Sequence, residues 1–196
     1  GLWPAGTRMA MTREGAIAGS VSGGCVDGDV IAEMARILDR ESDVRRLSFG
    51  ITDAEAWEAG LSCGGSLALL VERWDPLYET FIAELEGERP VGFASHLDNP
   101  RHLLRKADGT MLGSLGDRAW DAQVVEDMRR VWPGPHAEMH RYAQGEVFVE
   151  VVPPSLKLVI FGATDIARAL VSLARPMGFQ VVVSDARRAF LNKARF

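Results

Sequence analysis

Apolar positions recur along the chain with two different periods, and together they predict a mixed α/β fold. Small apolar and polar residues alternate over 8–12 and 16–21, on either side of Glu14-Gly15, and this pattern predicts a β-hairpin. Apolar residues spaced by three and four predict an amphipathic helix over about 30–40, with Asp29 as its N-cap. The same signals predict strands over 44–49 and 67–71, a short helix between Thr52 and Gly60, and a helix over 77–85.

A second stretch of the chain repeats this order of elements. An offset of 94 positions places Gly113-Ser114-Leu115 on Gly19-Ser20-Val21. We interpret the stretches at about 1–74 and 91–152 as the two copies of a weak internal duplication. The second copy has no cysteines, which indicates that the scaffold does not depend on them.

Pro153-Pro154 separates these stretches from a different pattern. A short apolar run, an amphipathic stretch and a second apolar run follow, at 156–161, 162–175 and 180–184. Strand, helix and strand of these lengths form a right-handed βαβ unit, the first piece of a doubly wound domain. The expected fold class is therefore α/β, with an N-terminal α+β domain followed by a truncated Rossmann-like βαβ unit.

The predicted domains are 1–152 and 153–196, the second being only the start of a Rossmann-like domain. The chain begins without Met, at Gly1, and stops at Phe196 just as another helix begins. We therefore expect a fragment, or the ordered part, of a longer protein.

Composition narrows the class of protein further. A length of 196 residues with 47% apolar content is ample for a packed core. No apolar run approaches the ~18–20 residues that cross a bilayer, and no signal peptide opens the chain, so we predict a cytoplasmic protein without a membrane span. A formal charge of −5 without a basic stripe argues against nucleic acid as a partner.

Two cysteine loops carry the most informative candidate chemistry, Ser22-Gly23-Gly24-Cys25 and Cys63-Gly64-Gly65. Glycine pairs let backbone N–H groups approach a ligand and hold an anion. Cys25 precedes a predicted helix, whose N-terminus favours the thiolate that binds metal or accepts sulfur, although Asp27 and Asp29 oppose that field. In the alternative interpretation the glycines serve tight turns and the cysteines are small core residues. The absence of both loops from the second copy favours a functional role for the cysteine loops over a purely structural one.

The four histidines, His96, His102, His136 and His140, do not complete an obvious metal site. A structural zinc ion needs four protein ligands, and the chain has two cysteines, which we expect to be reduced thiols. His136 and His140 are spaced by four, but the duplication places them near a strand, and their order is not that of zinc proteases. We predict that the histidines are surface or packing residues.

A third feature is the predicted strand-to-helix turn Gly162-Ala163-Thr164-Asp165, with Asp185 about 20 residues further on. The first Gly, the acid and their context match a dinucleotide fingerprint. Thr164 stands where a second glycine lets the backbone approach a pyrophosphate. Two interpretations stay open: a site for NAD(P) at Gly162, Thr164, Asp165 and Asp185, or a Rossmann-like unit used as scaffold or interface.

Several of these motifs together resemble the XdhC/CoxI family, over nearly the whole chain. The run from Gly19 to Gly28 is similar to that family's G-S-V-S-G-G-C-V-E-G signature, with Asp27 for the usual Glu. The run from Trp57 to Gly65 resembles its W-E-x-G-L-x-C-G-G, and residues 161–185 resemble its closing Rossmann-type domain. A common form of the family reads G-A-G-H at the nucleotide turn, from which Thr164 and Asp165 depart.

The resemblance implies an accessory chaperone, rather than a catalyst, for molybdenum hydroxylases. Such a protein holds molybdenum cofactor, promotes its sulfuration with a cysteine desulfurase, and inserts it into an apo-hydroxylase of the xanthine or carbon monoxide dehydrogenase type. On this hypothesis Cys25 and Cys63 ligate the molybdenum or carry sulfur, and the flanking glycines shape the pocket. Soft thiolates beside backbone donors suit a molybdenum dithiolene whose pterin carries a phosphate.

Two other classes of function remain as alternatives. An NAD(P)-dependent oxidoreductase would use the Rossmann-like unit and would bind nucleotide saturably. A purely protein-binding adaptor would tolerate replacement of both cysteines. An exposed sheet edge in half a Rossmann fold would also favour pairing, including with a second copy of the chain in a homo-oligomer.

Overall fold

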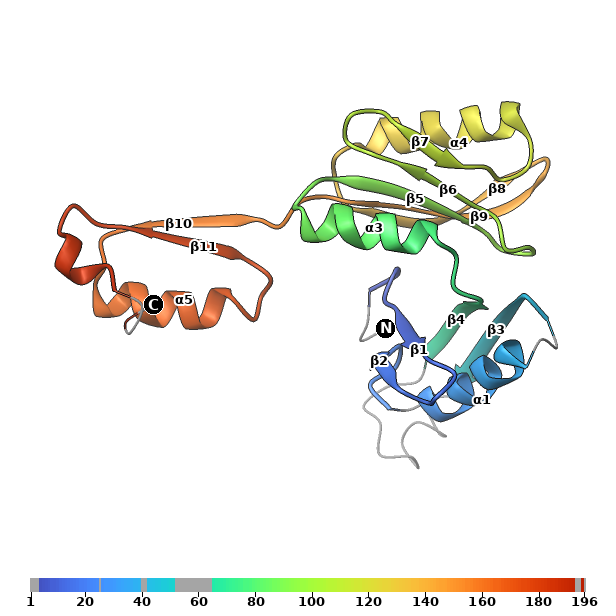
Figure 1. The fold of residues 1–196 in the computed structure, drawn as a ribbon, viewed down its shortest axis with the longest axis horizontal. Coiled ribbons are helices and arrows are strands. Elements are labelled where there is room, and N and C mark those ends of the chain that lie inside the picture. The colour runs from blue at the N-terminus through green and yellow to red at the C-terminus, as the bar shows by residue number, and fades with distance from the viewer. Residues whose placement is uncertain (1–3, 25, 40–41, 52–64, 193–194, 196) are drawn as a thin grey trace. The chain divides into compact units, whose positions relative to one another are not determined.

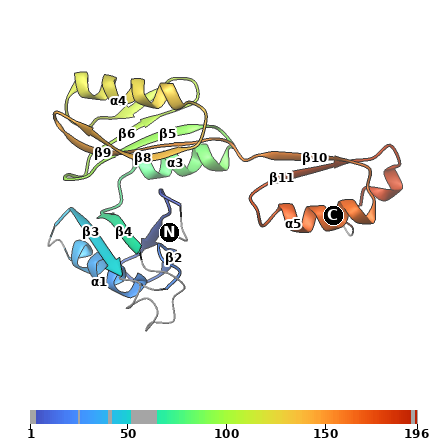
Figure 2. The same ribbon diagram turned by 180° about the vertical axis from the view of Figure 1, so that it is seen from behind.

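A computed structural model describes residues 4–24, 26–39, 42–51, 65–192 and 195. The chain divides into two compact units, Gly1–Pro153 (unit 1) and Pro154–Phe196 (unit 2) (Figures 1 and 2). Both units contain helices and sheets, and the predicted α/β class is confirmed. Among the described residues no helix combines the length and apolar character that crossing a membrane requires.

The first part of unit 1, which we call the hairpin lobe (residues 4–74), contains the predicted hairpin and helix. Strands β1 (Met9–Met11) and β2 (Ile17–Gly19) pair antiparallel, as predicted. Helix α1 (Asp27–Leu38) is amphipathic and packs Val30 and Ile37 into a small apolar core. Strands β3 (Val44–Ile51) and β4 (Gly65–Glu72) form a separate antiparallel pair. The helix predicted between Thr52 and Gly60 lies outside the described residues.

The predicted start of α1 was wrong. The helix begins at Asp27, three residues before the predicted position, and its N-cap residue is Val26, which makes no side-chain cap hydrogen bond. Asp29 lies in the first turn and does not cap the helix. The reason is local. The Asp27 carboxylate accepts from the hydroxyls of Ser20 and Ser22 in the preceding loop, and this holds the start of the helix at Asp27, about one turn before the predicted start.

The remainder of unit 1, the sheet lobe (residues 75–153), is a five-stranded antiparallel sheet in the order β7-β6-β5-β9-β8 (Figure 1). Its elements are α3 (Leu77–Glu86), β5 (Val91–His96), β6 (His102–Arg105), β7 (Met111–Gly113), α4 (Arg118–Val131), β8 (His136–Tyr142) and β9 (Gly145–Val152). Successive residues of β5 point to opposite faces of the sheet, and their contacts show that the two helices cover opposite faces. Phe93 packs with Phe81 of α3, whereas Ala94 packs with Val124 and Met128 of α4.

The two stretches that we interpret as copies share backbone geometry as well as element order. Gly19 and Gly113, 94 positions apart, both have positive φ, of 80° and 77°. A Cβ at either position would lie 2.3 or 2.4 Å from a backbone oxygen of the partner strand, that of Arg8 or that of His102. In the sheet lobe, β5 pairs with both β6 and β9 and joins the hairpin to the second strand pair. In the described part of the hairpin lobe no strand makes this connection, and the two pairs remain separate sheets.

Unit 2 is the predicted βαβ unit. Strands β10 (Lys157–Phe161) and β11 (Gln180–Ser184) pair in parallel, with α5 (Asp165–Ala174) between them in sequence and a short 3₁₀ helix (Arg188–Phe190) after β11. Helix α5 buries Ala167, Val171 and Ala174. The larger apolar residues on its other side, Ile166, Leu170 and Leu173, are exposed, so they do not form its packing face in this unit.

Candidate functional site

The loop between β2 and α1 carries the predicted site residues 22–24, and one carboxylate organises it. Asp27 accepts hydrogen bonds from the hydroxyl of Ser20 at 2.6 Å and from the hydroxyl and amide of Ser22 at 2.7 and 3.1 Å. Ser22 Oγ also accepts from the amide of Val26 at 3.0 Å. The loop is therefore tied to the start of α1 at both of its ends.

The same contacts determine the charge of the loop. Hydrogen bonds from the hydroxyls of Ser20 and Ser22 hold the pKa of Asp27 below its usual range, although burial opposes them, so this side chain is a carboxylate at neutral pH. The first amide that closes a turn of α1 is that of Val30, which donates to Val26 O, so the amides before it form the electropositive end of the helix.

Glycines keep one side of this loop open. Gly23 and Gly24 have φ values of 70° and 113°, in the region that favours glycine. Both residues are exposed, and a Cβ on Gly24 would meet no atom within 4 Å. The open position is Gly24, beside the start of α1, because the amides of Val21, Ser22, Gly23 and Val26 already donate to groups within the loop.

The described flanks of the two predicted cysteine loops pack in one hydrophobic cluster. Val21 and Val26, on either side of the first loop, belong to the cluster that also contains Val71 of β4. Leu67, two residues after Gly65, packs against that cluster. Residues of β4, the strand that begins at Gly65, therefore belong to or pack against the same cluster as the two residues that flank the first loop.

Three of the predicted site residues, Cys25, Cys63 and Gly64, lie outside the described residues. Gly65 is described: it is the first residue of β4, is exposed, and pairs with Ile51 of β3. The involvement of the cysteines therefore stays a prediction.

The stretch that we interpret as the second copy contains an arrangement around Asp121 like that around Asp27, without a cysteine. Asp121, 94 positions after Asp27, accepts from the hydroxyl of Ser114 at 2.7 Å and from the amide of Leu115 at 2.8 Å. Sequence reasoning missed this role and treated Asp27 only as a charge opposing a thiolate. The signal was available, because a serine precedes an aspartate by seven positions in both copies.

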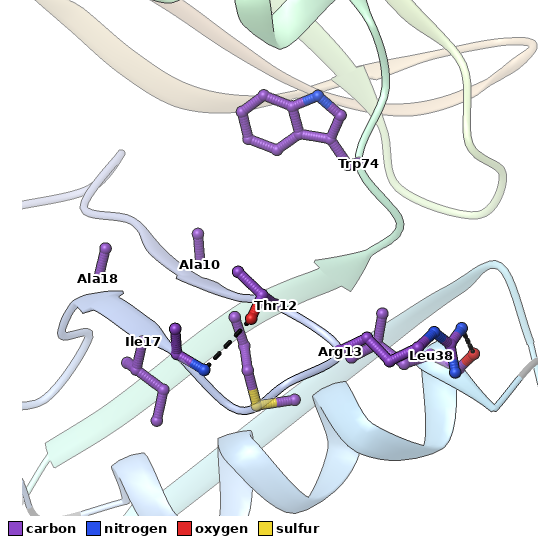
Figure 3. Close-up of a pocket in the computed structure, with 9 residues that line it drawn as sticks. Ala10, Thr12, Arg13, Ile17, Ala18, Leu38 and Trp74 are labelled. Atoms are coloured by element: carbon purple, nitrogen blue, oxygen red, sulfur yellow. Dashed lines mark hydrogen bonds between the residues drawn. The ribbon is translucent and has the colours of Figure 1, made fainter.

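An open hollow of about 500 Å³ is lined by the hairpin and not by the glycine loop (Figure 3). Its lining comes from the β1–β2 hairpin, from Leu38 at the end of α1 and from Trp74. Arg13 crosses its rim and donates to Leu38 O at 2.8 Å. The lining is mostly apolar and includes none of the predicted site residues.

At the predicted nucleotide turn, the polar groups bind one another. Gly162 has a φ of 107°, and Thr164 caps α5 by accepting from the amide of Ala167 at 3.2 Å. Asp185 accepts from the amide of Ala163 at 2.7 Å and from the side chain and amide of Arg187. These hydrogen bonds hold the pKa of Asp185 well below its usual range, and those from Arg187 contribute most to the shift.

The remaining predicted nucleotide residue, Asp165, lies at the start of α5. Its carboxylate is exposed and lies 3.2 Å from Arg195 and 3.7 Å from Arg168. Gly162, Thr164, Asp165 and Asp185 are therefore gathered at one turn, but Asp185 closes that turn internally rather than pointing its carboxylate outward.

A buried polar cluster near the junction of the hairpin and sheet lobes was not predicted. Glu72, the last residue of β4, accepts from the hydroxyl of Tyr78, and its Oε2 lies 3.4 Å from Nε2 of His102. Burial raises the pKa of Glu72 to about 7 and lowers that of His102. His102 and His96 are both buried packing residues, as predicted for the histidines. Only a tertiary structure brings Glu72 and His102 together, since they lie on different sheets.

Together the fold and the glycine loop define an α/β protein whose first lobe carries an anchored Ser-Gly-Gly loop and whose last unit is Rossmann-like. Residues 3–50 match the model for the XdhC and CoxI family, and residues 158–196 match the model for the XdhC Rossmann domain. The resemblance predicted from the sequence motifs is thereby confirmed, in the expected order along the chain.

Relatives and a solved structure agree with these matches. The chain is 26% identical over 197 residues to a protein of Bacillus subtilis (strain 168) described as a probable xanthine dehydrogenase subunit, covering 98% of this chain and 58% of that protein. It is 29% identical over 140 residues to the uncharacterized protein YqeB of Escherichia coli (strain K12), covering 60% of this chain and 26% of YqeB. The chain therefore spans less than two thirds of the length of either relative.

A crystal structure described as a xanthine dehydrogenase from Bacillus halodurans has the same fold. It superposes with a TM-score of 0.70 at 22% identity, and the match covers 96% of this chain and 55% of that chain. At this level of identity the likeness establishes the arrangement of elements and nothing about activity.

Proposed function

We propose that this chain is part of a cytoplasmic accessory protein that binds molybdenum cofactor, supports its sulfuration with a cysteine desulfurase, and inserts it into a molybdenum hydroxylase such as xanthine dehydrogenase. The observation that carries the proposal is the Ser22–Gly24 loop. It is fixed by Asp27, open at Gly24, and lies within the segment that matches the XdhC and CoxI family.

Two features support this proposal: the open position at Gly24 in the structure and the two cysteines in the sequence. Accessible backbone beside the start of α1 suits the phosphate of the cofactor, and Cys25 and Cys63 would supply soft thiolates to the metal. When bound, the cofactor would supply the metal–sulfur chemistry that a molybdenum hydroxylase requires. The role of the protein would be to hold the cofactor, through residues 22–25 and 63–65, until transfer.

The duplication provides a matched pair of variants to test this. Asp27→Asn weakens the acceptor that organises the cysteine-bearing loop. Asp121→Asn makes the same change in the stretch without cysteines. Anaerobic titration of the protein with molybdenum cofactor should give stoichiometric binding for the wild type and for Asp121→Asn. We expect binding to be lost in Cys25→Ser and in Cys63→Ser. In Asp27→Asn it should weaken by about tenfold, the loss typical of removing a supporting hydrogen bond at a metal site.

Circular dichroism of each variant checks that the fold is retained. Unchanged binding in both cysteine variants would rule out the proposed site. Absence of cofactor binding by the wild type, together with saturable NAD(P)H binding, would instead favour the oxidoreductase. The internal hydrogen bonds of Asp185 argue against that alternative, because the ribose of a dinucleotide would have to compete with Ala163 and Arg187.

A further inference from the structure

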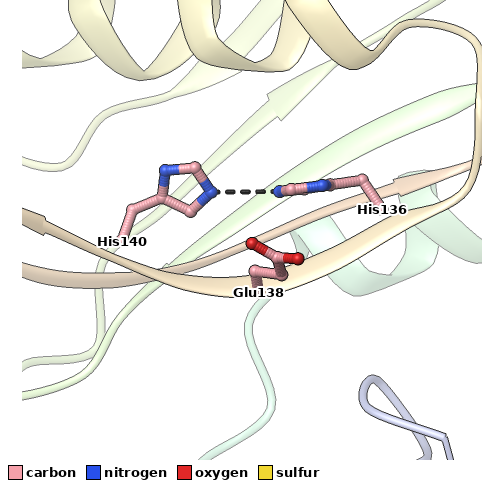
Figure 4. A group of neighbouring side chains, drawn as sticks. All are labelled: His136, Glu138 and His140. Atoms are coloured by element: carbon pink, nitrogen blue, oxygen red, sulfur yellow. Dashed lines mark hydrogen bonds between the residues drawn. The ribbon is translucent and has the colours of Figure 1, made fainter.

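The edge strand β8 gathers three potential metal ligands at one point of its surface. Ligand atoms of His136, Glu138 and His140 all lie within 4.8 Å of one another, and the Nε2 atoms of the two imidazoles are 3.0 Å apart (Figure 4). From these contacts we propose that β8 carries a binding site for a divalent first-row transition-metal ion such as Zn²⁺, separate from the cysteine loops.

The spacing of these residues does not by itself bring them together. Residues i and i+4 of a strand lie about 13 Å apart at their Cα atoms. The two imidazoles therefore lean toward each other along the strand, above Glu138, whose carboxylate points toward them (Figure 4). His136 and His140 were predicted to lie near a strand, and they lie on β8; the prediction that they are surface or packing residues did not include this convergence.

The distances fit coordination of one ion. Two imidazole nitrogens bound at about 2.0–2.1 Å to one tetrahedral ion lie roughly 3.3 Å apart, close to the 3.0 Å found between His136 and His140. Two imidazoles and a carboxylate form a donor set that suits Zn²⁺ and its first-row neighbours rather than Mg²⁺ or Ca²⁺, which prefer oxygen ligands. Three protein ligands leave at least one position for water or another ligand.

The strand holds these residues on a rigid and partly shielded surface. In the pairing of β8 with β9, His136, Glu138 and His140 lie opposite Val151, Val149 and Val147. These three valines are buried in the core under α4. His140 also stacks on Tyr142, with 6.2 Å between ring centroids and 13° between planes, and Tyr142 donates to Asp127 of α4 at 2.8 Å. The ligands thus stand on a formed antiparallel pair, so little ordering is required on binding.

The competing explanation is a hydrogen bond between two neutral imidazoles, one donating and one accepting. Zn²⁺ titration of the full chain separates the two explanations, provided that the cysteines cannot bind the ion. We therefore use Cys25→Ser/Cys63→Ser as the parent protein and add His136→Ala/His140→Ala or Glu138→Gln to it. Met139→Ala is the matched control, because Met139 lies between the ligands on the same strand, is exposed, and points to the opposite face.

We expect the parent protein and its Met139→Ala variant to bind one Zn²⁺ per chain by calorimetry. The histidine variant should lose that binding. Loss of groups that merely support a ligand costs about 10- to 100-fold in metal affinity, so Glu138→Gln should weaken binding at least about tenfold. Zn²⁺ should also raise the thermal midpoint of the parent and not that of the histidine variant. No binding by the parent, or binding that survives loss of both histidines, would overturn the proposal. Neither result bears on the proposed cofactor site, because the parent protein lacks both of its thiols.

Discussion

Glu72 shows how burial of a single side chain makes stability depend on pH. Its side chain is 8% exposed and accepts from Tyr78, and its Oε2 lies 3.4 Å from Nε2 of His102, whose pKa is lowered by burial. Desolvation raises the pKa of Glu72 from 4.5 to about 7 in the folded protein. The folded state therefore holds a proton that the unfolded state has released between these two pH values.

From this we predict that Glu72 lowers the free energy of unfolding as pH rises. The cost is absent below pH 4.5, grows through the interval up to about 7, and is complete above it. A pKa difference of this size corresponds to about 3 kcal/mol. In Glu72→Gln, which keeps an acceptor for Tyr78, the stability gain over wild type should increase by about that amount between pH 5 and pH 8.

Urea unfolding followed by tryptophan fluorescence measures this, because all five tryptophans precede residue 154 and report on unit 1. Glu79→Gln, an exposed neighbour on α3, serves as the control and should show no such increase. A gain in Glu72→Gln that is the same at both pH values would contradict the assigned cause.

At the residue scale, the sequence predicted where the loop residues are but not how they are held. The Ser-Gly-Gly run was identified from the sequence as a loop before a helix, and the positive φ values of its two glycines come from the structure. The role of Asp27 did not follow, because a carboxylate can accept from a loop or oppose a nearby thiolate with the same sequence. The hydrogen bonds of Ser20 and Ser22 decide between these, and they exist only in the folded loop.

The start of helix α4 provides a test of how much an N-cap contributes to stability. Asp117 is its N-cap residue, and its side chain accepts from the amide of Trp120 at 2.9 Å. Trp120 itself is buried in the core of the sheet lobe, 3% exposed. We predict that Asp117→Ala lowers the free energy of unfolding by about 1 kcal/mol, the usual cost of removing a cap. Asp117→Ser, which keeps a side-chain acceptor, should recover most of that loss in the same urea assay. Equal losses in the two variants would show that the cap hydrogen bond is not the cause.

Several elements were predicted from the spacing of apolar residues, and others from continuous apolar runs. The hairpin and α1 follow apolar spacings of two or of three to four, whereas both strands of the βαβ unit were predicted from short apolar runs. Strand β5 has no such signal, because all six of its residues are buried between α3 and α4. A central strand covered on both faces loses the alternation that marks an exposed one.

Helix α5 shows that apolar periodicity can predict a helix and still not identify its buried face. Its large apolar residues at 166, 170 and 173 are spaced as a packing face, yet the face buried against the strands consists of Ala167, Val171 and Ala174. Periodicity identifies that a helix is amphipathic. It does not identify which neighbour covers which side, and in unit 2 the side with the larger residues is exposed.

At the scale of the whole molecule, ion pairs of two kinds connect the hairpin lobe to the sheet lobe within unit 1. Arg46 of β3 reaches the exposed Asp98 at 2.8 Å and also pairs with Glu146. Arg8, just before β1, instead donates to the buried Glu150 of β9 at 3.0 Å, with its guanidinium 4.7 Å above the ring of Phe81. Burial raises the pKa of Glu150, and the hydrogen bond and charge of Arg8 oppose that rise.

These two contacts should therefore differ in their contribution to stability. Removing the partner of a buried charge costs more than removing a surface pair, so we predict a loss of about 2 kcal/mol or more in Arg8→Ala. Arg46→Ala should lose about 1 kcal/mol or less, because its partners remain in contact with water. Urea unfolding followed by tryptophan fluorescence compares the two variants directly.

A double variant separates the buried charge from the rest of the contact. In Arg8→Ala/Glu150→Gln the side chain at 150 carries no charge, so part of the stability lost in Arg8→Ala should return even though the ion pair is still absent. Since Glu150 is 2% exposed, the recovered part measures the cost of leaving its carboxylate buried without a partner. If the double variant is no more stable than Arg8→Ala, the stabilisation comes from the packing of Arg8 on Phe81, and the ion pair between the lobes contributes little.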